Sequence, residues 1–151
     1  MKNKFKKVLQ VGLVVDDVDA FVNRYEKDFG VGPWEVINFL PDTIPGMQVN
    51  GKTSALKMRV AFYRSFEVEL ELIQPVSESI FMDWLRKNGP GIHHVAFVPN
   101  EGYDAFVKDS AKMGKKPLME VLDGNKTRGF AYLDFMKELG LILEIHKGKP
   151  G

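Results

Sequence analysis

Apolar and polar residues follow two different periods along this chain, and the two periods predict strands and helices in a regular order. In several short segments apolar residues alternate with polar ones, which is the pattern of strands with two unlike faces. In others apolar residues recur every three or four positions, as in an amphipathic helix. The strands are predicted near residues 8–15, within 31–39, and near 55–63, 66–74, 92–98, 117–122, 128–135 and 141–147.

The predicted helices begin at capping side chains and end at glycines. Asp, Ser and Asn accept hydrogen bonds from the first helical turn, and glycine adopts the left-handed conformation that ends a helix. These signals place the three helices between Asp16 or Asp17 and Gly30, between Ser77 and Gly89, and between Asn100 and Gly114. Residues 40–53 are rich in proline and glycine, and we expect them to form a mobile loop.

The predicted elements occur twice in the same order, and the sequence repeats with them. The segment QVGLVVDDVDAFV resembles HVAFVPNEGYDAFV, which aligns Gln10 with His94. Near the end of each half LELI resembles ILEI, which aligns Glu71 with Glu144. Each half therefore consists of a strand, a helix and three further strands.

This repeat predicts the architecture of the whole chain, because duplicated units commonly stack into one fold. We expect an α+β fold with a first βαβββ module in residues 1–75 and a second in residues 91–151, joined by a connecting helix in residues 76–90. The two tandem modules are expected to form one structural domain with a curved, mainly antiparallel sheet around a cavity.

Four polar residues at equivalent places in the two modules suggest a binding site. Since side chains alternate along a strand, Gln10, Glu71, His94 and Glu144 lie opposite the apolar rows of their own strands. If the helices cover the apolar faces, the four side chains converge inside the sheet. One imidazole nitrogen and three oxygens then suit a divalent metal such as Zn, Co, Ni, Mn or Fe. The alternative is that these residues face water, as polar residues of antiparallel strands commonly do.

A second set of residues consists of candidates for binding a substrate. Lys57, Arg59 and Tyr63 alternate along one predicted strand and could meet a carboxylate or phosphate. Trp34 and the loop at 40–53 could wall the same pocket. The structural alternatives are a solvated positive strand face and an ordinary connecting loop. Glu69, although next but one to Glu71, is expected to be solvated.

The composition restricts the partners of the protein. The 151 residues carry 21 Lys and Arg against 20 Asp and Glu, a net charge of +1, so nucleic acid and membranes are not expected as partners. The absence of cysteine excludes disulfides and thiolate metal sites and is consistent with a reducing compartment. The basic and apolar N-terminal segment lacks a small-residue cleavage site, which favours a cytosolic start. We therefore expect a cytoplasmic protein with a small-molecule substrate.

Four segments together resemble one known superfamily. QVGLVV, VELELIQP, GIHHVAF and LILEIHK are similar, in this order and spacing, to the vicinal oxygen chelate superfamily, which includes glyoxalase I, methylmalonyl-CoA epimerase, extradiol dioxygenases and bleomycin resistance proteins. The epimerase-like or glyoxalase-like branch is the most similar. The resemblance covers nearly the whole chain and implies paired βαβββ modules that hold a metal through Gln10, Glu71, His94 and Glu144.

The sequence departs from this resemblance at two places. The first ligand of the branch is usually histidine, whereas this chain has Gln10, whose amide oxygen is a weaker ligand for borderline metals. The epimerases carry a catalytic glutamate in the loop after the second strand, whereas LPDTIPGMQVN here contains Asp42 and Gln48 but no glutamate. The second departure argues against standard methylmalonyl-CoA epimerase chemistry.

The resemblance implies a metal-dependent lyase or isomerase that transfers a proton next to the carbonyl of a small carbonyl or thioester substrate. Glu144 and Glu71 are the candidate bases, since carboxylate ligands of this superfamily can detach and accept a proton. The alternative is a metal-free protein of the bleomycin-resistance type that sequesters a small molecule. An extradiol dioxygenase is less compatible, because it needs two histidine ligands and His94 is alone among the ligand positions. Exposed sheet edges favour a homodimer.

Overall fold

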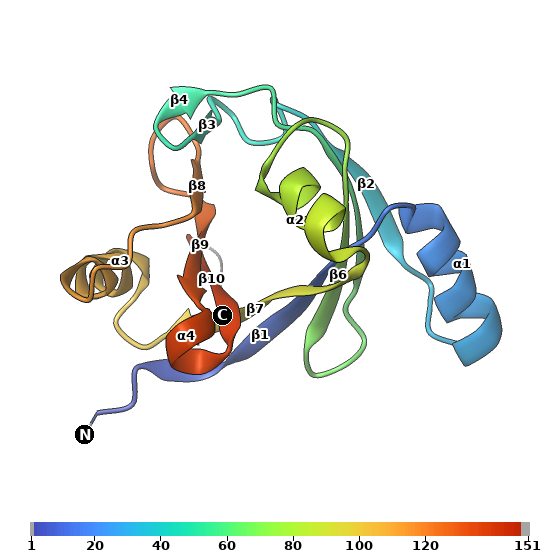
Figure 1. The fold of residues 1–151 in the computed structure, drawn as a ribbon, viewed down its shortest axis with the longest axis horizontal. Helices are drawn as coiled ribbons and strands as arrows, with labels where there is room; N and C mark the ends of the chain where they lie inside the picture. The colour runs from blue at the N-terminus through green and yellow to red at the C-terminus, as the bar shows by residue number, and fades with distance from the viewer. Residues whose placement is uncertain (1, 149–151) are drawn as a thin grey trace. The chain divides into compact units, whose positions relative to one another are not determined.

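The structure is a computed structural model that describes residues 2–148, and it divides into two compact units (Figure 1). The first unit consists of residues 10–41 and 55–93, and the described part of the second consists of residues 2–9, 42–54 and 94–148. Residues 149–151 of the predicted second module lie outside the described part of the chain. Each unit has its own strand pairing and its own apolar core.

The first unit holds two helices and a sheet with the strand order β2-β5-β6-β1. Its elements are β1 (Phe5–Val14, of which residues 10–14 belong here), α1 (Val18–Phe29), β2 (Glu35–Phe39), β5 (Met58–Tyr63), β6 (Glu69–Pro75) and α2 (Ile80–Asn88). Neighbouring strands are antiparallel except for β1 and β6, which run parallel. The parallel pair follows from the connections, because α1 carries the chain across the sheet and two later reversals return it beside β1.

Helix α1 forms because both of its ends are capped and its apolar face has a partner. Asp17 accepts a hydrogen bond from a first-turn N–H at 3.1 Å, and Gly30 ends the helix in the left-handed conformation with φ +65°. Trp34 packs between Tyr25 and Tyr63, with ring centroids 5.1 and 5.6 Å away. These contacts belong to an apolar core between α1 and one face of the sheet.

The second unit holds the strand order β7-β10-β9-β8-β3-β4. Its elements are β3 (Gln48–Val49), β4 (Lys52–Thr53), β7 (Gly91–Pro99, of which residues 94–99 belong here), α3 (Tyr103–Lys112), β8 (Met119–Leu122), β9 (Gly129–Phe135), α4 (Met136–Leu139) and β10 (Leu141–Lys147). Strands β7 and β10 run parallel, and the other neighbours are antiparallel. The second unit therefore repeats the pairing scheme of the first.

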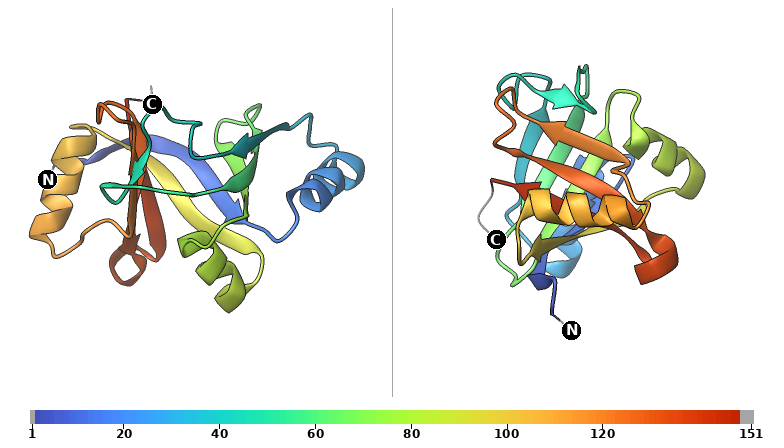
Figure 2. Two further views of the ribbon diagram at one scale, coloured as in Figure 1. Left: turned by 90° about the horizontal axis from the view of Figure 1, so that it is seen from above. Right: turned by 90° about the vertical axis from the view of Figure 1, so that its left-hand side faces the viewer.

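Helix α3 lies against one face of the second sheet (Figure 2, right-hand view). Phe106 of α3 and Leu143 of β10 share one apolar core. Phe5 and Phe97 pack against this core, with their ring centroids 4.7 Å apart. Because side chains alternate along β10, Glu144 lies on the opposite face.

The predicted α+β class is confirmed, as is mainly antiparallel pairing within each unit. The assignment of faces is also confirmed, since Leu13, Leu72 and Leu143 lie in or against the cores next to the helices. The one-turn helix α4 was not predicted. The cavity and the grouping of both modules into one domain stay predictions. Within residues 2–148, every helix is too short or too polar to cross a bilayer.

Two of the predicted helix caps are wrong, although both helices are present. Helix α2 is capped by Ser79, whose hydroxyl accepts a hydrogen bond from a first-turn N–H at 3.2 Å. The Ser77 hydroxyl accepts instead from the N–H that precedes β5. Before α3 the cap position is occupied by Gly102, while Asn100 donates to the Asn3 carbonyl oxygen at 2.6 Å. Both residues tie the chain to distant segments, which local sequence cannot reveal.

The segment 40–53 was predicted as a loop, but it contains the two short strands β3 and β4. Strand β3 pairs with β8, where Gln48 lies opposite Leu122. Gly46, with φ +65°, approaches Gly124 so closely that a Cβ atom would lie 2.8 Å from its Cα atom. A glycine is therefore required at that contact. The prediction failed because the pairing joins residues far apart in the sequence.

Candidate metal centre

Gln10 and Glu71 lie on the same face of the first sheet. In the parallel pair of β1 and β6, Gln10 is opposite Glu69 and Gly12 is opposite Glu71. Since alternate residues share a face, Gln10, Glu69 and Glu71 all point to one side. Leu72, on the other side, lies in the core beneath α1. The two predicted ligands are thus on the face that α1 does not cover.

The Gln10 side chain is held in place by Glu69. Gln10 is 1% exposed, and its Nε2 donates to Glu69 Oε1 at 2.5 Å. The other Glu69 oxygen accepts a hydrogen bond from Arg64 Nε at 2.6 Å, and Arg64 also pairs with Glu35. The prediction that Glu69 is solvated is therefore wrong. The sequence could have indicated this contact, because Glu69 is two residues before Glu71 and therefore on the same strand face.

His94 and Glu144 form a buried pair in the second unit. In the parallel pair of β7 and β10, Ala96 lies opposite Glu144, so His94 and Glu144 share a face. His94 Nε2 is 2.6 Å from Glu144 Oε2, and the two residues are 1% and 3% exposed. The ring of Tyr132 packs edge-on against the imidazole, with centroids 4.8 Å apart. The structure thus brings together two of the four predicted ligands within one unit.

The buried pair fits a metal ion. Among the residues that the structure describes, Glu144 Oε2 has no hydrogen-bond partner of acceptable geometry, although His94 Nε2 is 2.6 Å away. The imidazole nitrogen and the carboxylate oxygen are thus two buried polar atoms that face each other at close range. His94 and Glu144 are the residues that would hold a divalent cation here. Imidazole nitrogen and carboxylate oxygen are ligands of the borderline divalent metals, so the donor atoms fit the predicted group.

His146 lies beside the second oxygen of Glu144. Its Nε2 is 2.8 Å from Glu144 Oε1, and its side chain is 14% exposed. Burial alone would raise the pKa of Glu144, but attraction to His146 and His94 outweighs burial and holds that pKa well below its usual range. The carboxylate is therefore ionised at neutral pH, as a ligand or base must be. The sequence placed His146 on this face, and its role was missed.

The two units place their candidate ligands in the same register. In the first unit Gln10 lies opposite Glu69, which is two residues before Glu71. In the second unit His94 lies opposite Ile142, which is two residues before Glu144. The repeat in the sequence is therefore also a repeat in strand register, and it gives the two pairs of side chains equivalent places.

The predicted substrate-binding residues lie on the other face of the first sheet or outside it. Arg59 donates to Asp19 of α1 at 2.9 Å, and Tyr63 and Trp34 lie in the core beneath that helix. Lys57 precedes β5 and is exposed. These contacts give Arg59 and Trp34 roles in packing α1 onto the sheet. A role in substrate binding stays a prediction for all three residues.

Gln48, one of the two polar residues of the loop that lacks the epimerase glutamate, does not share the face of Glu144. It lies opposite Leu122, which packs against the core beneath α3, so Gln48 is on the α3 side of the sheet. There it lines a cavity of about 280 Å³ together with Tyr103 and Glu120. The Tyr103 hydroxyl donates to Glu120 at 2.5 Å. Gln48 therefore belongs to the α3 side of the sheet and not to the face that carries His94 and Glu144.

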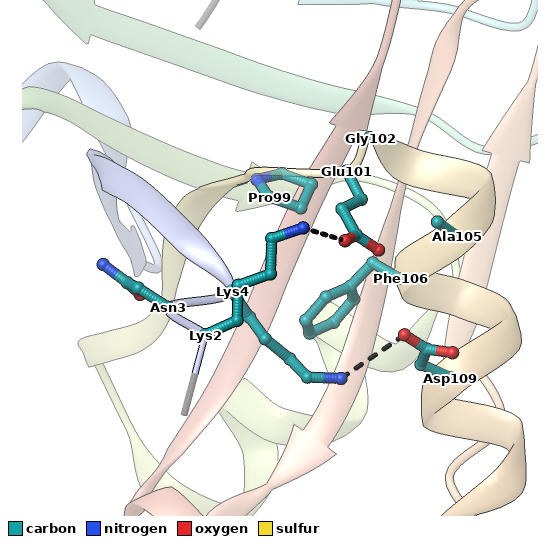
Figure 3. A pocket seen from close by; sticks show the side chains of 9 residues that line it. All are labelled: Lys2, Asn3, Lys4, Pro99, Glu101, Gly102, Ala105, Phe106 and Asp109. Atoms are coloured by element: carbon teal, nitrogen blue, oxygen red, sulfur yellow. Dashed lines mark hydrogen bonds and ion pairs between the residues drawn. The ribbon is translucent and has the colours of Figure 1, made fainter.

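A separate small pocket lies between the N-terminal segment and α3 (Figure 3). Its volume is about 110 Å³, and Phe106 contributes to its lining. Lys2 pairs with Glu101 at 3.1 Å, and Lys4 pairs with Asp109 at 3.3 Å. Exposed ion pairs of this kind contribute about 1 kcal/mol or less each. This pocket explains how the N-terminal segment is attached and is not part of the candidate metal centre.

Comparison with protein families gives one match over most of the chain. The family model of the glyoxalase/bleomycin resistance protein/dioxygenase superfamily matches residues 9–132. Among curated proteins, the uncharacterized protein YqjC of Bacillus subtilis (strain 168) is 44% identical over 45 residues. That match spans 29% of this chain and 32% of YqjC, so it covers about a third of the relative.

Several solved structures are similar to this chain along nearly its whole length. Methylmalonyl-CoA epimerase from Mycobacterium tuberculosis is 17% identical with a TM-score of 0.66, over 99% of this chain and 93% of that chain. A hypothetical protein from Bacillus halodurans C-125 is 20% identical with a TM-score of 0.66, over 96% of both chains. A variant of Streptomyces coelicolor methylmalonyl-CoA epimerase in complex with 2-nitronate-propionyl-CoA is 20% identical with a TM-score of 0.64, over 97% and 99%. At these identities the similarity establishes the fold.

Proposed function

Because the chain belongs to the glyoxalase/bleomycin resistance protein/dioxygenase superfamily, the vicinal oxygen chelate group, we propose that it is a metal-dependent isomerase or lyase. The reaction is proton transfer next to the carbonyl of a small carbonyl or thioester substrate. The observation that carries this proposal is the buried approach of His94 Nε2 to Glu144 Oε2 at 2.6 Å. A carboxylate and an imidazole that are buried side by side in this way are the arrangement expected of two ligands of one cation.

The proposed ligand set is Gln10, Glu71, His94 and Glu144. Two facts support adding Gln10 and Glu71 to the pair formed by His94 and Glu144. Gln10 and Glu71 lie on the sheet face away from α1, and His94 and Glu144 lie on the face away from α3. Both pairs also occupy the same register in equivalent strands. One imidazole with oxygen donors accepts several borderline metals, so Zn, Co, Ni, Mn and Fe are all compatible.

When bound, the cation would act as a Lewis acid on a substrate oxygen and make the proton on the neighbouring carbon easier to remove. Glu144 is proposed to accept that proton, so that a C–H bond breaks and an O–H bond forms on the carboxyl group. Return of the proton to the same or an adjacent carbon completes an isomerisation without any other reactant. Glu71 is the second candidate base. Gln10 cannot share this role, because a side-chain amide has no basic group at neutral pH.

An acyl-CoA thioester is the first substrate class to test. One structural neighbour, the Streptomyces coelicolor epimerase, was solved with 2-nitronate-propionyl-CoA. In this chain the loop glutamate of the epimerases is missing, and the acyl group is therefore proposed to differ from methylmalonyl. A thiol adduct of a 2-oxoaldehyde, the glyoxalase type of substrate, is the second class.

The assembly and the location of the protein are subordinate proposals. Strand β2 is at one edge of the first sheet, and open edges allow copies of a chain to pair, so we propose a homodimer. Sedimentation of the purified protein would give its mass in solution. A cytoplasmic location stays a prediction.

Metal analysis followed by a proton-exchange assay tests the function. Purified protein is expected to bind about one divalent ion per chain by titration. In D2O the loaded protein should exchange the proton beside the carbonyl of a bound acyl-CoA or thiol adduct, as seen by NMR. Chelation should stop the exchange, and metal should restore it. Protein that binds no divalent ion on titration would contradict the proposal. Stoichiometric ligand binding without exchange after chelation would favour a sequestering protein.

A further inference from the structure

We propose that Glu69 is a positioning residue that fixes the rotation of the Gln10 amide, so that the oxygen and not the NH2 group is the atom offered to a metal. This inference rests on the proposed function, in which Gln10 is a ligand. A glutamine side chain carries an oxygen and an NH2 group on the same carbon, and the oxygen is the atom that coordinates cations. A glutamine ligand therefore needs a neighbour that decides which of the two atoms it offers.

The geometry of β1 and β6 supplies that neighbour. Glu69 lies directly opposite Gln10 in the parallel pair, and Gln10 Nε2 donates to Glu69 Oε1 at 2.5 Å. An ionised carboxylate accepts hydrogen bonds but cannot donate them. The opposite rotation of the amide would place the Gln10 oxygen against a carboxylate oxygen, which is repulsive. The contact therefore fixes the NH2 group toward Glu69 of β6 and directs the amide oxygen Oε1 away from that carboxylate.

Glu69 is itself fixed by neighbouring side chains. Its Oε2 accepts a hydrogen bond from Arg64 Nε at 2.6 Å, and the Arg64 guanidinium lies 4.4 Å from the centre of the Phe62 ring. Glu35 pairs with the same guanidinium. With the Glu69 side chain 12% exposed, water has little access to replace its contact with Gln10. The amide is therefore held by a carboxylate that has little freedom to move.

The hydrogen bond also changes the ligand strength of the amide. Donation from an amide N–H to a partly buried carboxylate polarises the amide and increases the negative charge on its oxygen. This effect partly offsets the weakness of an amide oxygen compared with an imidazole. Residues that orient a metal ligand in this way typically change metal affinity by about 10- to 100-fold.

The second unit provides an internal comparison. At the position equivalent to Glu69, opposite His94, the chain has Ile142. An acidic side chain thus occurs where the first-strand ligand is an amide and is absent where that ligand is an imidazole. This difference supports a role for Glu69 that is tied to glutamine, because general stabilisation of the sheet would not require it.

The test is a double-mutant cycle on metal affinity, measured by calorimetric titration with Co²⁺ alone. Glu69→Ala is expected to weaken Co²⁺ binding by about 10- to 100-fold. Gln10→Ala should weaken it as well, and the double variant should bind no more weakly than Gln10→Ala. Independent, additive losses would overturn the proposal, because Glu69 would then act without Gln10. Thermal unfolding of each variant checks that the fold is retained.

Two further variants separate positioning from general support of the sheet. Gln10→His removes the need to orient an amide, so adding Glu69→Ala to it should leave Co²⁺ affinity within a few-fold. A loss as large as in the wild-type background would overturn the proposal. Arg64→Met removes the ion pair but keeps the bond between Gln10 and Glu69, and it should cost less affinity than Glu69→Ala. An equal loss would assign the effect to the ion pair.

The outcomes also distinguish this inference from the proposed function. Wild-type protein that binds no Co²⁺ would contradict both. Wild-type protein that binds Co²⁺ while Glu69→Ala binds it equally well would contradict the positioning role alone. The shift of the Co²⁺ absorption bands offers a second readout, since loss of an oxygen ligand changes the coordination sphere.

Discussion

The two units use one strand scheme to present different chemical groups. In each unit the first and last strands pair in parallel and place two candidate ligands on one face of the sheet. This face lies away from α1 in the first unit and away from α3 in the second. The first unit offers the amide of Gln10 and the carboxylate of Glu71, whereas the second offers His94 and Glu144. The repeated strand register therefore gives the two pairs of side chains equivalent places, and the residue types at those places differ between the two units.

The neighbours of the ligands differ more than the ligands do. In the first unit Glu69 holds the Gln10 amide, and in the second His146 lies 2.8 Å from Glu144. Neither neighbour has an equivalent in the other unit, where Ile142 and Ile73 take these places. Each unit therefore places a different polar neighbour beside one of its candidate ligands.

The largest effect is expected from removing a candidate ligand of the second unit. His94→Ala or Glu144→Gln should lower metal affinity by more than about 100-fold, above the range for residues that only orient ligands. Calorimetric titration measures the affinity, and the NMR exchange assay should show loss of turnover. These residues are buried as a pair, so thermal unfolding must accompany the titration.

His93 is the matched control for His94. It lies next to it but on the other strand face, packed against Phe81 and Trp84 with ring centroids 5.3 and 5.4 Å away. His93→Gln should therefore keep most of the metal affinity and lose some thermal stability. Loss of metal binding in His93→Gln with retention in His94→Ala would contradict the assignment of ligands.

Removing His146 is expected to have the next largest effect. His146→Ala leaves Glu144 Oε1 without its imidazole neighbour, so the carboxylate should be less well oriented. Metal affinity should fall by about 10- to 100-fold, with Co²⁺ titration as the measurement. The control is Lys147→Ala on the adjacent, more exposed position, which should be neutral. Unchanged affinity in His146→Ala would show that Glu144 needs no such support.

Gln10→His would make the two units more alike. An imidazole is a stronger ligand than an amide oxygen for borderline metals, so this variant should bind Zn²⁺ or Co²⁺ several-fold more tightly than the wild type. Competition with a chelating dye measures the change. Weaker binding would mean that residue 10 is not a ligand or that the site requires an oxygen there.

The smallest expected effect concerns the turn of the second module. Thr127 donates its N–H and its hydroxyl to Asp123 at 2.7 and 2.9 Å. Burial raises the pKa of Asp123, but the hydrogen bonds outweigh burial, so the folded-state pKa lies below the ordinary 3.8. A lowered pKa stabilises the folded state above the unfolded-state pKa, and this contribution is lost as the pH falls through the folded-state value.

Urea unfolding at pH 7 and below pH 4 tests this turn. The wild type should lose more stability on acidification than Asp123→Asn, which cannot be protonated. Equal losses would contradict the expected pKa shift. The first module provides the contrast, since its second and third main strands are joined by the long segment that contains β3 and β4.

The sequence predicted what depends on local periodicity. Alternation in β1 and β10 correctly separated Gln10 and Glu144 from the apolar rows, and Asp17 and Gly30 correctly bounded α1. Repeated segments predicted the module order. These features depend on neighbours along the chain, which the sequence shows directly.

The remaining features depend on pairing between distant strands. Glu69 meets Gln10 only because β6 returns beside β1, and the pairing of β3 with β8 brings Gly46 against Gly124. Ser77 has the side chain of a helix cap and lies near a helix start, but its hydroxyl accepts a hydrogen bond from the N–H of Lys57 instead. Such contacts require the strand register, which no local pattern contains.

The most direct measurement is a crystal structure of protein loaded with Co²⁺ or Zn²⁺, with anomalous diffraction recorded on both sides of the metal absorption edge. We predict one strong peak bound by His94 Nε2 and a Glu144 oxygen, with Glu71 and the Gln10 oxygen completing the ligand set. A peak elsewhere, or a peak that lacks His94 and Glu144 among its ligands, would contradict the proposed metal centre.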